Sequence, residues 1–224
     1  MKKKIFVIAV VACILSLSIV GTSMAYFTDT EKYTNVFTAG NVEIKLTESV
    51  VEADDYGHLV ATAETTTIDD VDTRKDYEKI FPSQTIEKNP TIVNTGSEDA
   101  YVGAIISIES NGFNTIVADS NIDEFITDLS TDATITYTKT TNGYTLYMIF
   151  DDAIAKDGSY TLFEGLKVFD DWDNDQMEKL NGLEIVVNAY ATQVSGFADA
   201  TIALTTAFET KGWDALSTTP LPSN

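Results

Sequence analysis

The sequence has one cysteine and one histidine among its 224 residues, and these scarcities restrict its chemistry. Cys13 lies in an apolar stretch that we expect to be removed, which leaves no disulfide and no thiolate ligand or nucleophile. His58 alone excludes the two-histidine zinc helix of common metallopeptidases. It would also be the only base for a serine triad, and no Gly-x-Ser-x-Gly turn lies near it. We therefore expect a protein that is not an enzyme and has no cofactor.

Basic residues are also scarce, with 14 Lys and Arg against 35 Asp and Glu and a formal charge of −21. Such a charge opposes binding to nucleic acid or to anionic lipid, so we expect neither as a partner. Hydrophobic residues nevertheless make up 44% of the chain, which is too much for an acidic disordered chain. The composition predicts a folded domain with an acidic surface.

The first 25 residues have the pattern of a secretory signal peptide. Lys2–Lys4 precede the apolar run 5–20, and Ser23-Met24-Ala25 forms a small-x-small site before Tyr26. The sixteen-residue run is shorter than the ~20 residues of a usual membrane span. We expect cleavage between Ala25 and Tyr26, contact with the membrane only during export, and a mature charge of −24 once the three lysines are removed. The alternatives are a retained membrane helix and lipidation at Cys13.

The remaining chain alternates between short β-rich stretches and turn signals, which predicts a mainly β, antiparallel β-sandwich with a few short helices on its loops. We place this single domain at 41–216, with a flexible tail over 217–224. One strand is predicted to begin at 42, and another to end at the turn Asn94-Thr95-Gly96. A buried central strand is predicted over 100–108, a hairpin over 133–150 around Asn142-Gly143, and further strands over 160–169 and 183–194.

Three helices are predicted from N-cap residues. Ser120 begins a capping box before the apolar positions of 122–129, and Asp173 precedes a helix over 174–180. Asp199 precedes a helix over 200–209, with Ile202 and Ala203 followed by Thr206 and Ala207 on one side. The acidic, threonine-rich stretch 48–76 is predicted to be a surface excursion or a long hairpin.

Several motifs together resemble the TasA/CalY/camelysin family. These are the aromatic start after Ala25, Asn35-Val36-Phe37-Thr38-Ala39-Gly40, Phe81-Pro82, Val93-Asn94-Thr95-Gly96 with Ala100-Tyr101-Val102, and Ala189-Tyr190-Ala191-Thr192-Gln193 before Gly196-Phe197. Ser83-Gln84 replaces the family's Gly-Asp, and Gly103 stands where a basic residue is usual. The resemblance implies a jelly-roll sandwich, export by a Gram-positive bacterium, processing by a SipW-type signal peptidase, and assembly into biofilm-matrix fibres.

The segment 26–40 is the predicted donor strand of such fibres. It is rich in aromatic and β-branched residues, and those expected to bind a neighbouring subunit are Tyr26, Phe27, Tyr33, Val36 and Phe37. Head-to-tail strand addition is open-ended and gives a homopolymer, which an accessory protein could anchor or seed. From the residues alone, the alternatives are a strand of the chain's own sheet and a frayed end.

Metal binding and other functions remain as alternatives. Asp171, Asp173 and Asp175 have the spacing of the first ligands of a calcium loop, but Gln176 and Gly182 stand where an EF-hand needs Gly and Glu. An acidic helix N-terminus explains the same residues. Asp69, Asp70 and Asp72 form a second acidic group. The family resemblance adds a camelysin-like metallopeptidase as an alternative, and the stretch 48–76 adds a monomeric surface adhesin.

Overall fold

The computed structural model describes residues 41–67, 80–209 and 219–221. The chain divides into two units, Met1–Ala39 and Gly40–Asn224, and all described residues belong to the second. No helix in these described ranges is long and apolar enough to cross a membrane.

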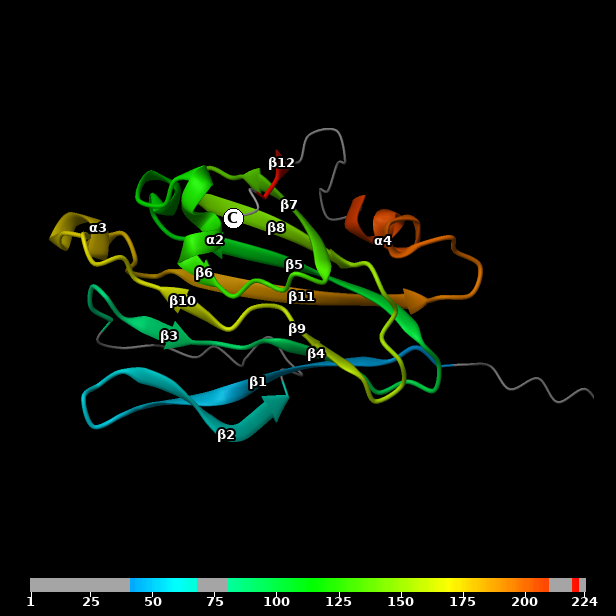
Figure 1. Cartoon of the computed structure of the whole chain (residues 1–224). Coiled ribbons are helices and arrows are strands. Elements are labelled where there is room, and N and C mark those ends of the chain that lie inside the picture. Colours follow the sequence, from blue (N-terminus) through cyan, green and yellow to red (C-terminus); the bar gives the residue numbers. More distant parts are fainter. Residues whose placement is uncertain (1–40, 68–79, 210–218, 222–224) are drawn as a thin grey trace, which may run out of the picture. The chain divides into compact units, whose positions relative to one another are not determined.

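The described strands form three antiparallel sheets (Figure 1). The four-stranded sheet has the order β2 (Leu59–Thr67), β1 (Ile44–Ala53), β4 (Thr91–Asn94), β9 (Ser159–Thr161). The three-stranded sheet has the order β3 (Thr85–Glu87), β10 (Gly165–Lys167), β6 (Ile126–Thr127). The five-stranded sheet has the order β11 (Glu184–Gln193), β5 (Ala100–Glu109), β8 (Gly143–Phe150), β7 (Ala133–Lys139), β12 (Thr219–Pro220). The helices are η1 (Phe113–Thr115), η2 (Asp119–Asn121), α2 (Ile122–Phe125), α3 (Asn174–Glu178) and α4 (Ala200–Glu209).

Strand β5 is buried on both faces, as its apolar sequence predicts. Side chains of successive strand residues point to opposite faces. The even-numbered residues from Val102 to Ile108 therefore enter the main core, which also contains Ile92 and Leu166 from the other two sheets. Ile105 points the other way, into a smaller core beneath α4. The mainly β, antiparallel fold with short helices is confirmed, whereas the jelly-roll topology stays a prediction.

Helix α4 covers the outer face of the five-stranded sheet. The side chain of Asp199 accepts a hydrogen bond from Ile202 N at 2.8 Å, which confirms the predicted N-cap. Of the residues predicted to share one side of the helix, Ala203 is buried and Ile202 is 55% exposed, and the helix also buries Leu204 and Phe208. A Cβ at Gly103 would lie 2.9 Å from Phe208 Cζ and 3.1 Å from Leu204 Cδ1. This departure from the family motif therefore lets α4 approach β5.

The predicted hairpin over 133–150 is confirmed as β7 and β8. Its glycine is required by close packing, because a Cβ at Gly143 would clash with the backbone carbonyl of Ile108 on β5. Helix α3 is also confirmed, with a reciprocal capping box between Asp173 and Gln176. Its predicted terminator, Gly182, has a φ of 72°.

Two predictions of single elements were wrong. The stretch 160–169 is split between β9 and β10, which belong to different sheets. The helix expected over 122–129 ends at Phe125, and no side chain caps it. Ile126 pairs with Leu166 of β10 instead, because an apolar residue at this point is buried better in the three-stranded sheet.

The described part of the acidic stretch 48–76 is a hairpin of β1 and β2. Its first residue, Glu48, is only 3% exposed and forms an ion pair with Lys88. At the other end of the chain, Thr219–Pro220, which fall in the predicted flexible tail, pair with β7.

Candidate functional site

The predicted functional residues of the N-terminal segment lie outside the described residues. This applies to the cleavage site, Ala25 and Tyr26, and to the donor residues Phe27, Tyr33, Val36 and Phe37. What the structure shows is how the chain enters the folded domain at Asn41, and which strand edges that domain leaves open.

The entry point is fixed by what we call the N-terminal clasp, residues 41–43 together with 95–97. Glu43 O accepts hydrogen bonds from Thr95 N at 2.9 Å and Gly96 N at 3.0 Å. Asn41 O accepts one from Ser97 N at 2.9 Å, and Asn41 N donates to Ser97 Oγ at 3.0 Å. A Cβ at Gly96 would overlap Asn41 O and lie 2.8 Å from Glu43 N, so only glycine allows this contact.

Asn94, a fully buried amide, holds the clasp in place. Its Nδ2 donates to Glu98 O at 2.8 Å and Ile154 O at 3.0 Å, while its Oδ1 accepts from Gly96 N at 3.0 Å. Because buried polar groups are costly unless they are hydrogen-bonded, one side chain here fixes three backbone groups, two in the loop that follows it and one at Ile154. The predicted Asn-x-Gly turn therefore holds residues 41–43 in place, where the chain enters the sandwich.

Strand β9 is the last described strand of its sheet, and one of its edges is open. Leu162 N donates to Pro90 O, and Asn94 N donates to Gly158 O, at 2.9 and 3.0 Å. Since antiparallel strands bond at alternate residues, the N–H and C=O groups of Ser159 and Thr161 point away from β4. A sheet edge of this kind is a template for one more strand.

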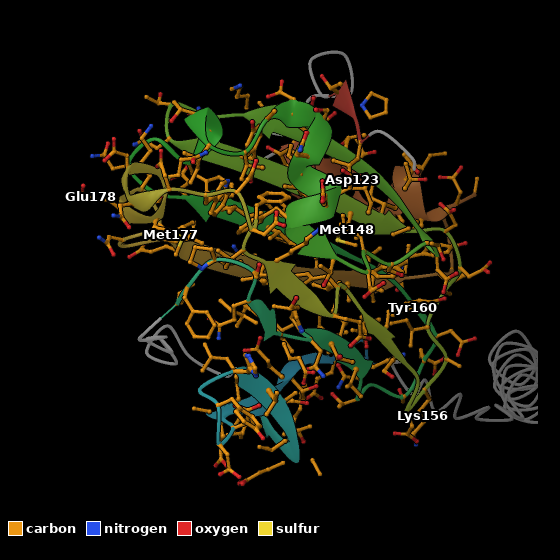
Figure 2. All side chains as sticks on the ribbon, turned by 60° about the vertical axis from the view of Figure 1, so that its left-hand side comes forward. Asp123, Met148, Lys156, Tyr160, Met177 and Glu178 are labelled. Carbon is orange, nitrogen blue, oxygen red and sulfur yellow. The ribbon has the colours of Figure 1, made fainter. Side chains whose placement is uncertain are left out.

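An open cleft of about 540 Å³ lies beside this edge. It is lined by Asp128, Leu129, Ser130, Thr131, Asp132, Ser159, Tyr160, Thr161 and Glu164. Tyr160, labelled in Figure 2, stacks on Phe150 of β8 with ring centroids 4.3 Å apart. Ser130 N donates to Leu162 O at 3.0 Å, which ties the segment 128–132 to the chain that follows β9.

The cleft is strongly acidic. Three of its lining residues are carboxylates and none of the described lining residues is basic. Burial, and then the negative charges of Asp152, Asp132 and Asp151, raise the pKa of the Tyr160 hydroxyl. Acidic residues just outside the lining therefore add to the negative electrostatic potential of the cleft, which favours a cationic group inside it.

The candidate metal ligands are not brought together. In the described ranges no three His, Cys, Asp or Glu side chains are grouped so that they could hold a metal ion. Asp173 accepts a hydrogen bond from Gln176 N at 3.0 Å as the cap of α3, whereas Asp69, Asp70 and Asp72 lie outside the described residues. His58 Nδ1 lies 3.1 Å from Asp54 Oδ2 in the β1–β2 turn.

Comparison with known proteins gives the family. A family model described as camelysin metallo-endopeptidase matches residues 1–142, which is more than half of the chain. The chain belongs to the camelysin family. This confirms the resemblance to TasA, CalY and camelysin, and the camelysin match spans the N-terminal segment, the clasp and β5. No curated protein and no solved structure matches.

Reasoning from sequence missed the open edge of β9 and the buried position of Asn94. The first could not be seen, because the stretch 160–169 looked like one continuous strand. The second had a signal, since an Asn two residues before a Gly often bonds the backbone of its own turn. That signal indicated the turn but not the burial.

Proposed function

We propose that this camelysin-family protein is an exported structural subunit that polymerises into extracellular fibres. A SipW-type signal peptidase cleaves between Ala25 and Tyr26, and the segment 26–38 then adds as a strand to the next subunit. The homopolymer belongs to the biofilm matrix or cell surface of a Gram-positive bacterium, and an accessory protein that anchors or seeds fibres is compatible with this scheme.

One observation carries the proposal: the chain divides between Ala39 and Gly40, so the segment 26–38 belongs to a different compact unit from the described domain. The clasp holds the junction by backbone hydrogen bonds. A β-rich segment that precedes such a domain suits strand addition, in which main-chain bonds give affinity and alternate side chains give specificity. Signal removal would free that segment at the moment of export.

The test compares three purified chains by negative-stain electron microscopy and size-exclusion chromatography. The chain that begins at Tyr26 should form filaments. A chain extended upstream by a few residues should assemble less, and a chain lacking 26–34 should remain monomeric. Thermal unfolding of the monomeric deletion should be cooperative, which shows that the domain is folded. Filaments of normal length from the deletion would refute strand donation.

The family description favours metallo-endopeptidase activity as the second candidate function. Its test is cleavage of casein with and without a chelator, with His58→Ala as the matched variant. Cleavage that is lost in both the chelated sample and the His58→Ala variant would support the peptidase. A third outcome, single particles by electron microscopy without cleavage, would favour the monomeric adhesin.

A further inference from the structure

We propose that the open edge of β9, with its acidic cleft, is the acceptor for the segment 26–38 of a second copy of this chain. This inference rests on the proposed function and names the surface that the proposed function requires. The acceptor residues are the outward backbone groups of Ser159 and Thr161 and the carboxylates of Asp128, Asp132 and Glu164.

The other described sheet edges are less suited. The edges of β2 and β3 lie against each other, because Ala61 N of β2 donates to the Glu87 carboxylate of β3 at 2.6 Å. Strands β6 and β12 have two residues each, which gives too few backbone groups for pairing. Strand β11 lies against β1 of the opposite sheet. Strand β9 joins an outward backbone row to a cleft.

Charge complementarity selects the face of the incoming strand. Strand alternation puts Asp29 and Glu31 on one face of the segment 26–38. Its only basic residue, Lys32, lies on the other face with Thr34 and Val36. The acid-free face therefore fits the acidic cleft, with Lys32 placed near the carboxylates at its rim and Val36 against its apolar residues, while the two acids point away. Of the predicted donor residues, Tyr26 and Val36 lie on this face, whereas Phe27, Tyr33 and Phe37 share the face of the two acids.

The segment can reach a second copy more directly than its own β9. The clasp lies on the β1 side of β4, and β9 lies on the other side. A strand added beyond β9 would be three strand spacings from β1, or about 14 Å. If the segment returned to the β9 of its own chain, it would have to span that distance and cross the loop 95–97, which is hydrogen-bonded to residues 41–43 in the clasp.

Cysteine pairing tests the contact directly, because the chain that begins at Tyr26 has no cysteine of its own. One chain carries Ser159→Cys, a second carries Thr34→Cys, and the mixture is oxidised mildly during assembly. A disulfide requires Cα atoms roughly 4.4–6.8 Å apart, so a mixed dimer on a non-reducing gel reports adjacency. Partner cysteines at positions 32 to 36 should cross-link best at one register. Matched controls place the acceptor cysteine on other edges, as Thr65→Cys on β2 and Thr192→Cys on β11.

The outcomes separate the inference from the proposed function. Filaments with a Ser159→Cys cross-link support both, whereas filaments whose cross-links form only at Thr65→Cys or Thr192→Cys overturn the acceptor assignment alone. Monomers that cross-link internally when one chain carries both Ser159→Cys and Thr34→Cys overturn it as well. If no filaments form under any condition, the proposed function fails, and the acceptor fails with it.

Two substitutions, each with a matched control, extend the test. Thr161→Pro removes an outward N–H and leaves the backbone bonds to β4 intact, so it should slow fibre growth at least tenfold. Thr161→Val keeps the N–H and should not, although both variants lose the side-chain hydrogen bond to Thr91. Lys32→Glu should slow growth similarly, whereas Asp29→Lys, on the opposite face, should not. Light scattering measures growth in both cases, and equal growth of Thr161→Pro and wild type would overturn the proposal.

Discussion

Replacement of the buried amide of Asn94 by a carboxylate should destabilise the domain strongly although the side-chain shape hardly changes. Asn94→Asp loses the two hydrogen bonds from Nδ2 to Glu98 O and Ile154 O, each worth about 1 kcal/mol. It also points a buried negative charge at those two carbonyl oxygens. An uncompensated buried charge costs about 3–5 kcal/mol, so we expect a loss of that size at pH 7.5. For a domain of this length the melting temperature would fall by roughly 6–20 °C.

The loss should depend on pH with a definite sign. Burial and the neighbouring carbonyls would raise the folded-state pKa of the carboxyl that Asn94→Asp introduces above the usual aspartate value of about 3.9. The folded state then binds more protons than the unfolded state, so stability falls as pH rises between the two pKa values. The deficit relative to wild type should therefore be largest at pH 7.5 and smaller near pH 4, as measured by thermal unfolding at both values.

Asn114 supplies a matched control. Its Nδ2 also donates to two backbone carbonyls, Thr140 O at 2.9 Å and Thr141 O at 3.1 Å, but the residue is only half-buried. Asn114→Asp should therefore cost less than about 1 kcal/mol. Equal losses at the two positions, or a deficit at Asn94→Asp that does not shrink at low pH, would refute the argument from burial.

Three further outcomes are expected. Hydrogen bonds from Lys139 and then Tyr144 hold the pKa of Asp119 below its usual value of 3.8. The contribution of Asp119 to stability is therefore present above that pH and is lost as the pH falls through the folded-state pKa. Asp119→Asn should reduce the loss of stability that urea titrations measure between pH 5 and pH 2. Lys88→Met should destabilise the domain in urea unfolding, because the buried Glu48 loses its ion pair with Lys88, and Glu48→Gln added to it should restore part of the loss. Because each mature subunit would carry a charge of −24, added salt should increase lateral bundling of preformed fibres by light scattering, and indifference to salt would contradict the charge argument.

Local signals in the sequence were sufficient for elements whose partners lie nearby in the chain. The β7–β8 hairpin follows from Asn142-Gly143 between two β-rich arms, and α3 and α4 begin where Asp173 and Asp199 can cap them. In these cases the residues that determine the structure lie within a few positions of one another.

The candidate site could not be predicted because it depends on contacts between distant segments. The segment 128–132 lies beside β9, and this arrangement depends on the passage of the chain from one sheet at Thr161 to another at Gly165. The alternation of apolar and polar residues does not show to which sheet a short strand belongs. The helix expected after Ser120 failed for the same reason, since pairing with Leu166 outweighs a weak local preference.

The two-sided burial of β5 distinguishes the middle of this sandwich from its margin. Deletion of a single residue before Gly103 would turn Ile105 into the space of its even-numbered neighbours in the main core. It would also place a side chain against Phe208, where Gly103 now leaves room. Contacts on both faces therefore fix the register of β5. Strand β9 has three residues and one inward aromatic ring, and no such lock applies to it. Under the proposed strand addition, the border of this fold would exchange partners while its centre keeps a single arrangement.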